Sequence, residues 1–372
     1  MKRMTLRWLP ILILITIAGC SSSSSNKKDD ATTGEYCTNG SLVSATWVSK
    51  LIKYHEDGST SEAPLDYDYE RTHKYLIFET SWGPVADATK YNAGHVPGAI
   101  HSDSDIYENG DPRWFLLPDS EIFDSMESMG ITADTTVIVY SSDPSFAARL
   151  WWILKYAGLE DVRYLDGGYE KWTADGFTGE TTVNYPTAAT VDYTGPVNPD
   201  FIATVDYVAA HYTDTDNYII ADVRDEDEYN GVITGYDYVI EKGRIPNAIW
   251  FYPVGGENDH YFNSDNTLKS LDDILSMWQD FGVTDGTSTN TFSKEIIFYC
   301  GGGYRSAAAF FYAYLMGYTN IRNLSDGWEG WSTTYTYDDS ADGDCNGGEY
   351  GQKHGAWTSD YCQKPSGRDI EP

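Results

Sequence analysis

The feature that most constrains the fold is an internal repeat in which an apolar run, a loop, a helix-like stretch and a second apolar run follow in order. Each run has the length and composition of a buried strand. Each helix-like stretch is rich in alanine and aromatic residues and ends at a glycine, Gly158 or Gly317. The paired segments are Thr136–Tyr140 with Glu295–Tyr299, 146–157 with 306–316, and 161–165 with 320–324. Strand, loop, helix and strand in this order predict parallel sheets in an α/β fold.

The repeat extends beyond this unit on both sides. Upstream, each copy has an apolar run that ends in an acid and then a turn containing proline; downstream, each ends on a turn containing glycine and tryptophan. The pairs are 75–79 with Tyr218–Asp222, 94–100 with 243–249, and 166–172 with 325–331. We therefore predict two α/β domains, 41–182 and 200–335, each a parallel-sheet core flanked by helices. A linker at 183–199 joins them, and a glycine-rich tail without strands follows at 336–372.

The N-terminus has the pattern of an export signal. Basic residues precede the apolar run 9–17, which is too short to span a bilayer as a mature helix. The sequence Ile17-Ala18-Gly19-Cys20 resembles the bacterial lipobox, which implies a signal peptide at 1–19 and a lipid on Cys20. The alternative is an ordinary signal peptide with an incidental cysteine. A serine-rich tether at 20–40 follows.

These features imply a lipid-anchored protein of the cell envelope that touches the membrane only through its N-terminal lipid. Ser21 stands where an aspartate would favour retention in an inner membrane, so the resemblance favours the outer membrane. Which face of that membrane the protein occupies stays open. The formal net charge of -32 argues against nucleic acid as a partner, because phosphates would be repelled.

The five cysteines divide by position. Cys20 belongs to the lipid and Cys300 to the repeat, which leaves Cys37, Cys345 and Cys362. A disulfide between Cys345 and Cys362 would staple the tail in an oxidising compartment. A zinc site built from the remaining three is the alternative, but no CxxC spacing supports it. The acidic segment 338–344 lacks the spacing of a calcium loop, so we expect no metal and no cofactor.

The loop after the second strand carries the chemistry. It reads Cys300-Gly301-Gly302-Gly303-Tyr304-Arg305 and lies between a strand and a helix start, where partial positive charge favours a thiolate. Backbone N–H groups of the glycines can turn inward and cradle an anion, and Arg305 adds a charge. A cysteine phosphatase loop has one more residue between cysteine and arginine than the four found here. The loop therefore favours sulfur over phosphate; the competing interpretation is a small buried core cysteine.

These motifs resemble the tandem rhodanese family of sulfurtransferases, of the thiosulfate and 3-mercaptopyruvate type, in a bacterial lipoprotein form. The resemblance covers about residues 41–335 and implies that Cys300 is the nucleophile. It also implies a substrate cradle formed by the loop, with support from the Asp-x-Arg strand end. The implied cradle and support residues are Gly301, Gly302, Gly303, Tyr304, Arg305, Asp222 and Arg224. Ser141 stands where the first copy would have its cysteine, so the first domain is expected to be catalytically silent.

Three positions depart from the family pattern. Glu228 occupies the place of an arginine that binds an anionic donor, and Arg244 replaces a histidine in the proline turn. Arg244 either supplies the missing charge or faces solvent, and Arg224 is either an ion-pair partner in the fold or a direct participant. Ser325 stands where the family has an aspartate. These departures leave the sulfur donor open.

Two classes of function follow. In the first, Cys300 cycles between thiolate and persulfide and moves sulfane sulfur from a small donor, such as thiosulfate, 3-mercaptopyruvate or polysulfide, to a thiol or cyanide-like acceptor. In the second, the cradle binds a sulfur or selenium oxyanion, or docks a redox partner of the cell envelope, without turnover. The complete cysteine loop favours the enzyme.

Overall fold

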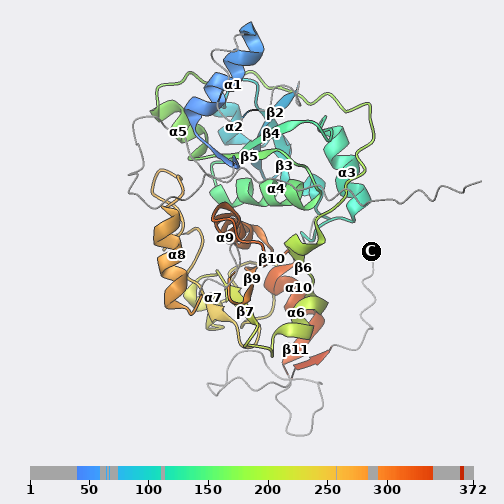
Figure 1. Cartoon of the computed structure of the whole chain (residues 1–372). Coiled ribbons are helices and arrows are strands. Elements are labelled where there is room, and N and C mark those ends of the chain that lie inside the picture. The colour runs from blue at the N-terminus through green and yellow to red at the C-terminus, as the bar shows by residue number, and fades with distance from the viewer. Residues whose placement is uncertain are drawn as a thin grey trace, which may run out of the picture.

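The computed structural model describes residues 40–58, 64, 67, 74–109, 114–256, 258–283, 292–337 and 361–363. They form two main sheets, each of five parallel strands with helices on both faces (Figure 1), and one small two-stranded sheet. The strands of the first sheet are β1 (Leu42–Val43), β2 (Tyr75–Ser81), β3 (Ile100–Asp103), β4 (Thr136–Tyr140) and β5 (Val162–Leu165). Those of the second are β6 (Ile202–Ala203), β7 (Tyr218–Asp222), β8 (Ile249–Trp250), β9 (Glu295–Tyr299) and β10 (Ile321–Leu324).

The two sheets have the same strand order, which confirms the α/β fold and the repeat. The orders are β1-β5-β4-β2-β3 and β6-β10-β9-β7-β8. In each sheet the middle strand, β4 or β9, is almost wholly buried, as its uninterrupted apolar run predicts for a strand covered on both faces. The middle strands therefore lead into equivalent loops of the two halves: β4 leads into the loop that starts at Ser141, and β9 into the loop that starts at Cys300.

The helices of the first half are α1 (Ala45–Asp57), α2 (Thr89–Ala93), α3 (Asp119–Ser128), α4 (Pro144–Tyr156) and α5 (Gly168–Ala174). Those of the second half are α6 (Val205–His211), α7 (Glu226–Tyr229), α8 (Leu271–Asp280), α9 (Tyr304–Leu315) and α10 (Gly327–Thr334). Short 3-10 turns lie at Ser104–Tyr107 and Pro199–Phe201. The chain between α5 and the second turn carries no helix or strand.

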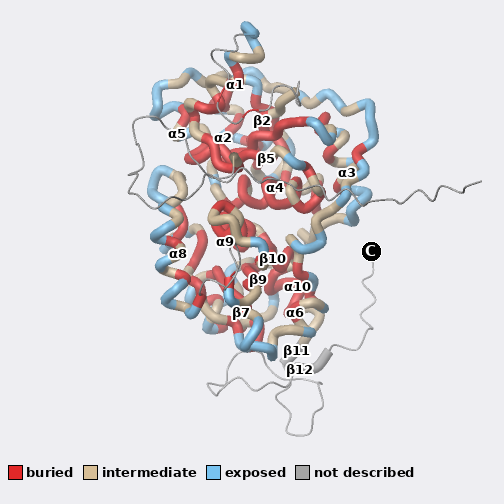
Figure 2. Tube along the Cα trace, viewed as in Figure 1, coloured by how far each residue is buried: buried red, intermediate tan, exposed pale blue. Residues whose placement is uncertain are grey.

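Helices α4 and α9 pack against each other between the two sheets, and both are buried (Figures 1 and 2). Trp151 of α4 contacts Phe311 and Tyr314 of α9, with ring centroids 4.6 and 4.8 Å apart. Near the N-terminal ends of the same helices, Phe146 contacts Tyr304 at 4.9 Å. One apolar cluster thus runs through both halves. Because α4 and α9 follow the equivalent loops of the repeat, their packing brings those loops near each other.

Two sequence predictions were wrong. The glycine- and tryptophan-containing segments predicted as turns begin the helices α5 and α10, in which Trp172, Trp328 and Trp331 are buried. The tail was expected to lack strands, yet β11 (Tyr335–Tyr337) pairs antiparallel with β12 (Tyr361–Gln363). The tyrosines and threonine of β11 have high β-propensity.

Several predictions lie outside the described residues. They are the signal peptide, the lipid on Cys20, the tether, Cys37, Cys345 and the acidic segment 338–344. The side chain of Cys362 is also outside the description, so the disulfide, zinc and calcium alternatives stay as they were, and the domain limits remain predictions. Within the described part of the chain, no helix is long and apolar enough to cross a membrane.

Candidate active site

Cys300 lies at the end of β9, in the first position of the loop that leads into α9. Its side chain has no exposed surface. The Gly303 N–H donates to Cys300 Sγ at 3.2 Å, and the Ser306 hydroxyl lies 3.6 Å from the same sulfur. The sulfur therefore sits at the start of a helix with a backbone donor aimed at it, an arrangement that stabilises negative charge on sulfur.

The glycines of this loop differ in what surrounds them. A Cβ atom at Gly301 would overlap the ring of Tyr236, and one at Gly303 would overlap the carbonyl of Ser325. Gly303 also has a φ of 88°, which favours glycine. Gly302 is open, because the nearest atom to an added Cβ is the Tyr238 hydroxyl at 3.8 Å. The neighbours of Gly301 and Gly303 explain why a side chain is excluded there.

Arg305 is the loop's cation, but its charge is matched by carboxylates. Its Nη1 and Nη2 donate to Glu228 at 2.8 and 2.9 Å, and Nη1 lies 3.6 Å from Asp225. Burial alone would raise the pKa of Glu228, but Arg305 holds it below the ordinary value of 4.5. Glu228, which stands where the family resemblance predicts a donor-binding arginine, thus pairs with Arg305 of the cysteine loop.

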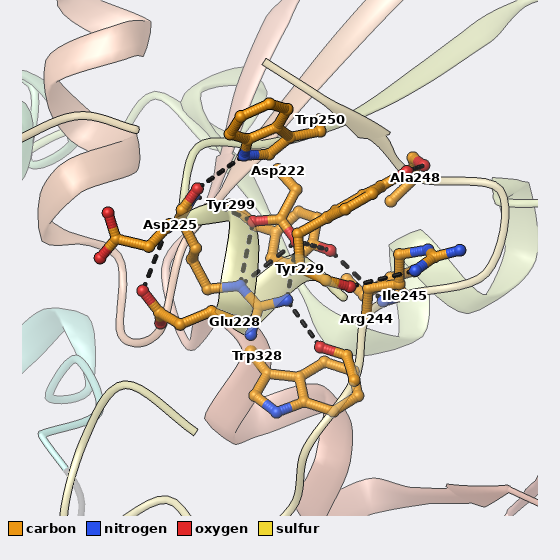
Figure 3. Close-up of polar contacts among 12 residues, drawn as sticks. Asp222, Asp225, Glu228, Tyr229, Arg244, Ile245, Ala248, Trp250, Tyr299 and Trp328 are labelled. Carbon is orange, nitrogen blue, oxygen red and sulfur yellow. Dashed lines mark hydrogen bonds and ion pairs between the residues drawn. The ribbon is translucent and has the colours of Figure 1, made fainter. Parts of the chain in front are cut away.

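Asp222 and Arg224 form a separate, fully buried ion pair with three Arg224–Asp222 side-chain hydrogen bonds of 2.7–3.2 Å. The Tyr299 hydroxyl donates to Asp222 Oδ2 at 2.5 Å (Figure 3), and Arg224 also donates to the carbonyl of Gly243 at 2.8 Å. Burial alone would lower the pKa of Arg224, but Asp222 raises it above its ordinary value. The pair joins the end of β7 to the loop before β8, and neither residue lines the cavity described next.

Arg244 lies on this same loop (Figure 3). Its Nη1 donates to the carbonyl of Tyr229 at 3.1 Å, and its guanidinium lies 4.4 Å from the centre of the Tyr229 ring. It does not line the cavity either. The structure therefore brings together the cysteine loop, Arg305 and Glu228, and places Asp222, Arg224 and Arg244 in a supporting network beside them.

A cavity of about 410 Å³ lies between the two halves and reaches the cysteine loop. Seven aromatic side chains line it: Trp82, Trp114, Phe115, Phe146, Tyr236, Tyr238 and Tyr304. Five carboxylates and one guanidinium line it as well: Asp105, Asp143, Asp225, Glu228, Glu329 and Arg305. The loop contributes Gly302, Tyr304 and Arg305 to the wall, so the cavity reaches the loop that carries the thiol, although Cys300 itself is buried behind the lining.

A hydrogen-bond network beside the cavity joins the two halves. The Tyr304 hydroxyl donates to Glu108 Oε2 at 2.7 Å, and Arg149 donates to Glu108 Oε1 at 2.9 and 3.1 Å. Glu108 and Arg149 belong to the first half and are buried. Burial raises the pKa of Glu108, and the charge of Arg149 partly offsets the rise. The first half thus holds the residue next to the glycines of the loop in place.

The equivalent loop of the first half has a different environment. Ser141 is buried, and its hydroxyl accepts from the Asp143 N–H at 3.1 Å. A segment of the second half lies against it: Asn266 donates to the Ser142 carbonyl at 3.1 Å, and the Leu268 N–H donates to Asp166 at 2.8 Å. A serine and a covering segment at this loop agree with the expectation of a catalytically silent first domain, which remains a prediction.

The aromatic wall of the cavity was not predicted from the sequence. Trp82 and Trp114 come from loops of the first half, and Tyr236 and Tyr238 from a loop of the second. Their signal in the sequence was an aromatic content of 15%, which does not say which rings meet. The one local pattern among these residues is that tyrosines stand at positions 236 and 238, with Asp237 between them.

Fold and site together define a tandem rhodanese-like protein. The family model of the rhodanese-like domain matches residues 74–175 and 204–334, and the chain belongs to this family. It is 32% identical to thiosulfate sulfurtransferase YnjE of Escherichia coli, over 70% of this chain and 58% of that protein. It is also 32% identical to the sulfur carrier protein TtuD of Thermus thermophilus, over 66% of this chain and 85% of TtuD. The chain thus spans less than two thirds of YnjE.

Solved structures with a similar fold include other proteins that share about 30% of their sequence with this chain. The anaerobic ergothioneine biosynthesis enzyme of Chlorobium limicola, in complex with its natural substrate trimethyl histidine, is similar with a TM-score of 0.70 and 30% identity. That likeness covers 80% of this chain and 69% of the other. The crystal structure of YnjE is similar with a TM-score of 0.67 and 28% identity, over 80% and 67% of the two chains.

Proposed function

We propose that this protein is a sulfurtransferase that carries sulfane sulfur on Cys300 as a persulfide. The observation that carries the proposal is the position of Cys300 Sγ at the start of α9, with the Gly303 N–H aimed at it at 3.2 Å. The relatives YnjE and TtuD are named a thiosulfate sulfurtransferase and a sulfur carrier protein, which supports sulfur transfer.

The reaction has two steps. In the first, the Cys300 thiolate attacks the outer sulfur of the donor; a new S–S bond forms, and the donor residue leaves with the electron pair of the broken bond. In the second, a nucleophilic acceptor attacks the outer sulfur of the persulfide and the Cys300 thiolate leaves. Backbone N–H groups of the loop stabilise the thiolate at the beginning and the end of the cycle.

The charge of the site bears on the donor. Thiosulfate and 3-mercaptopyruvate are anions, but Arg305 is already paired with Glu228, and four further carboxylates line the cavity. An anionic donor would meet repulsion there. Inorganic polysulfide is an anion too, but its charge lies on the sulfur chain itself, and neither it nor a protein persulfide has a carboxylate or sulfonate group that needs a cation of the site. We therefore propose polysulfide-type sulfur as the better donor, with thiosulfate a poor one.

The test measures sulfur transfer to cyanide with polysulfide and with thiosulfate, in the unmodified chain and in Cys300→Ser. We expect thiocyanate formation that depends on Cys300, with a higher kcat/KM for polysulfide. Thiocyanate formed equally by Cys300→Ser would rule out the persulfide. Binding of sulfite or selenite without transfer from any donor would favour the non-catalytic module instead.

We also propose that the chain is exported and anchored by lipid on Cys20, in the cell envelope, where a thiol or a redox partner takes the sulfur. The motif Ile17-Ala18-Gly19-Cys20 supports this. Mass spectrometry of the N-terminal peptide from membranes tests it. A diacylglyceryl group on Cys20, absent in Cys20→Ala, is expected, and an unmodified cysteine in an intact leader would contradict the proposal.

A further inference from the structure

The cavity above the cysteine loop is built from aromatic rings that contact one another from the surface inward. Trp82, which is 60% exposed, contacts Trp114 edge-on with ring centroids 5.5 Å apart. Trp114 contacts Tyr238 at 4.6 Å, and Tyr238 contacts Tyr236 at 5.2 Å. The Tyr236 ring fills the space that a side chain at Gly301 would occupy. The series therefore leads from the mouth of the cavity to the residue next to Cys300.

A carboxylate stands beside the outer part of this series. Asp105 Oδ2 accepts from the Trp82 indole at 2.9 Å. The other oxygen, Oδ1, is buried and accepts no hydrogen bond from a residue within the described part of the chain. Burial raises the pKa of Asp105, and the indoles of Trp82 and Trp114 partly offset the rise. A positive charge placed between the rings would compensate this carboxylate.

Negative charge predominates in the lining of the cavity. Of its charged groups five are carboxylates, and the guanidinium of Arg305 is bonded to one of them, Glu228. The chain as a whole carries a net charge of -32, so its field attracts cations toward the mouth of the cavity. Aromatic faces attract cations as well, most strongly when water is excluded. A cation that cannot donate hydrogen bonds, such as a quaternary ammonium group, suits rings better than it suits a hydrogen-bonding site.

We propose that the sulfur acceptor of this protein is a thiol that carries a quaternary ammonium group, held between Trp82, Trp114 and Tyr238 beside Asp105. This rests on the proposed sulfurtransferase function. The acceptor thiolate attacks the outer sulfur of the Cys300 persulfide and forms a new S–S bond. The Cys300 thiolate leaves with the electrons of the broken bond, so no oxidant or reductant is required.

Binding is tested first, because it does not depend on sulfur transfer. Calorimetry of the full chain carrying Cys300→Ser compares choline with 3,3-dimethylbutan-1-ol, which has the same shape without the charge. We expect choline to bind at least about 10-fold more tightly. Trp114→Ala and, separately, Asp105→Asn should each remove most of this preference. Tyr185→Ala, at a residue that is 72% exposed and outside the cavity lining, is the control and should keep the preference.

Transfer is tested with the corresponding thiols. Thiocholine and 3,3-dimethylbutane-1-thiol are compared as acceptors for the preformed persulfide. The kcat/KM for thiocholine is divided by that for the neutral thiol, in the unmodified chain and in Asp105→Asn. Comparing this ratio between the two proteins removes the difference in intrinsic reactivity of the two thiols. The ratio of kcat/KM should fall about 10-fold in the variant.

Equal binding of choline and its neutral analogue would overturn the cation site, even where persulfide forms normally. A cation preference without any persulfide would instead overturn the proposed function and leave the site standing. If Trp114→Ala does not fold, Asp105→Asn and the comparison of the two ligands still decide.

Discussion

The guanidinium of Arg305 donates one hydrogen bond to each carboxylate oxygen of Glu228, at 2.8 and 2.9 Å. This pairing changes what the cysteine loop offers to a substrate. The family resemblance of the sequence predicts an arginine that binds an anionic donor at the position of Glu228; here Glu228 instead pairs with the loop's own arginine. The cavity beside Cys300 becomes acidic, which connects the departure at a single residue with the choice of substrates.

The first prediction concerns pH and Glu228. Its pKa is lower in the folded chain than the ordinary 4.5, so the pair contributes stability above that pH and loses it as the pH falls below 4.5. Glu228→Gln keeps an acceptor but loses the charge, and should lower the free energy of unfolding at pH 7 by about 2 kcal/mol. The difference from the unmodified chain should shrink toward pH 3. Urea unfolding at both pH values checks this, and a difference independent of pH would contradict the pairing.

The second prediction uses the two neighbouring glycines of the loop. Gly301→Ala forces a Cβ atom into the Tyr236 ring and should lower the free energy of unfolding by about 2 kcal/mol. Gly302→Ala meets only the Tyr238 hydroxyl, at 3.8 Å, and should leave stability within about 0.5 kcal/mol. Urea titration of both variants makes the comparison. Equal losses would mean that Tyr236 does not lie against Gly301.

The third prediction concerns the contact between the halves. Tyr304→Phe removes the hydroxyl that donates to the buried carboxylate of Glu108, and should cost about 1–2 kcal/mol of unfolding free energy. The aromatic contact with Phe146 is kept. Tyr185→Phe, at an exposed tyrosine, is the matched control and should cost nothing measurable. If Tyr304→Phe leaves the free energy of unfolding unchanged, this hydrogen bond does not help to hold the two halves together.

Much of the fold could be predicted from the sequence because the repeat is local and its strands are apolar throughout. The predicted strand Thr136–Tyr140 coincides with β4, and Glu295–Tyr299 with β9. The predicted helices agree with α4 and α9 to within two residues. The helices α5 and α10 were not predicted, because they are short and start at glycines, and the burial of their tryptophans is a property of the folded chain.

The site was harder to predict than the fold. The loop from Cys300 to Arg305 is contiguous, so its position at a strand–helix junction could be anticipated. The pairing of Arg305 with Glu228 joins residues 77 positions apart, and the bond from Tyr304 to Glu108 spans 196. Which rings line the cavity depends on how α4 packs against α9. A pattern of residue types carries no information about such contacts between halves.

The measurement that tests the central claim most directly is the intact mass of the reduced chain after incubation with polysulfide, for the unmodified protein and for Cys300→Ser. The account predicts a gain of one sulfur atom that needs Cys300 and is reversed by cyanide. No gain in the unmodified chain with polysulfide or thiosulfate, or the same gain in Cys300→Ser, would contradict the persulfide on Cys300.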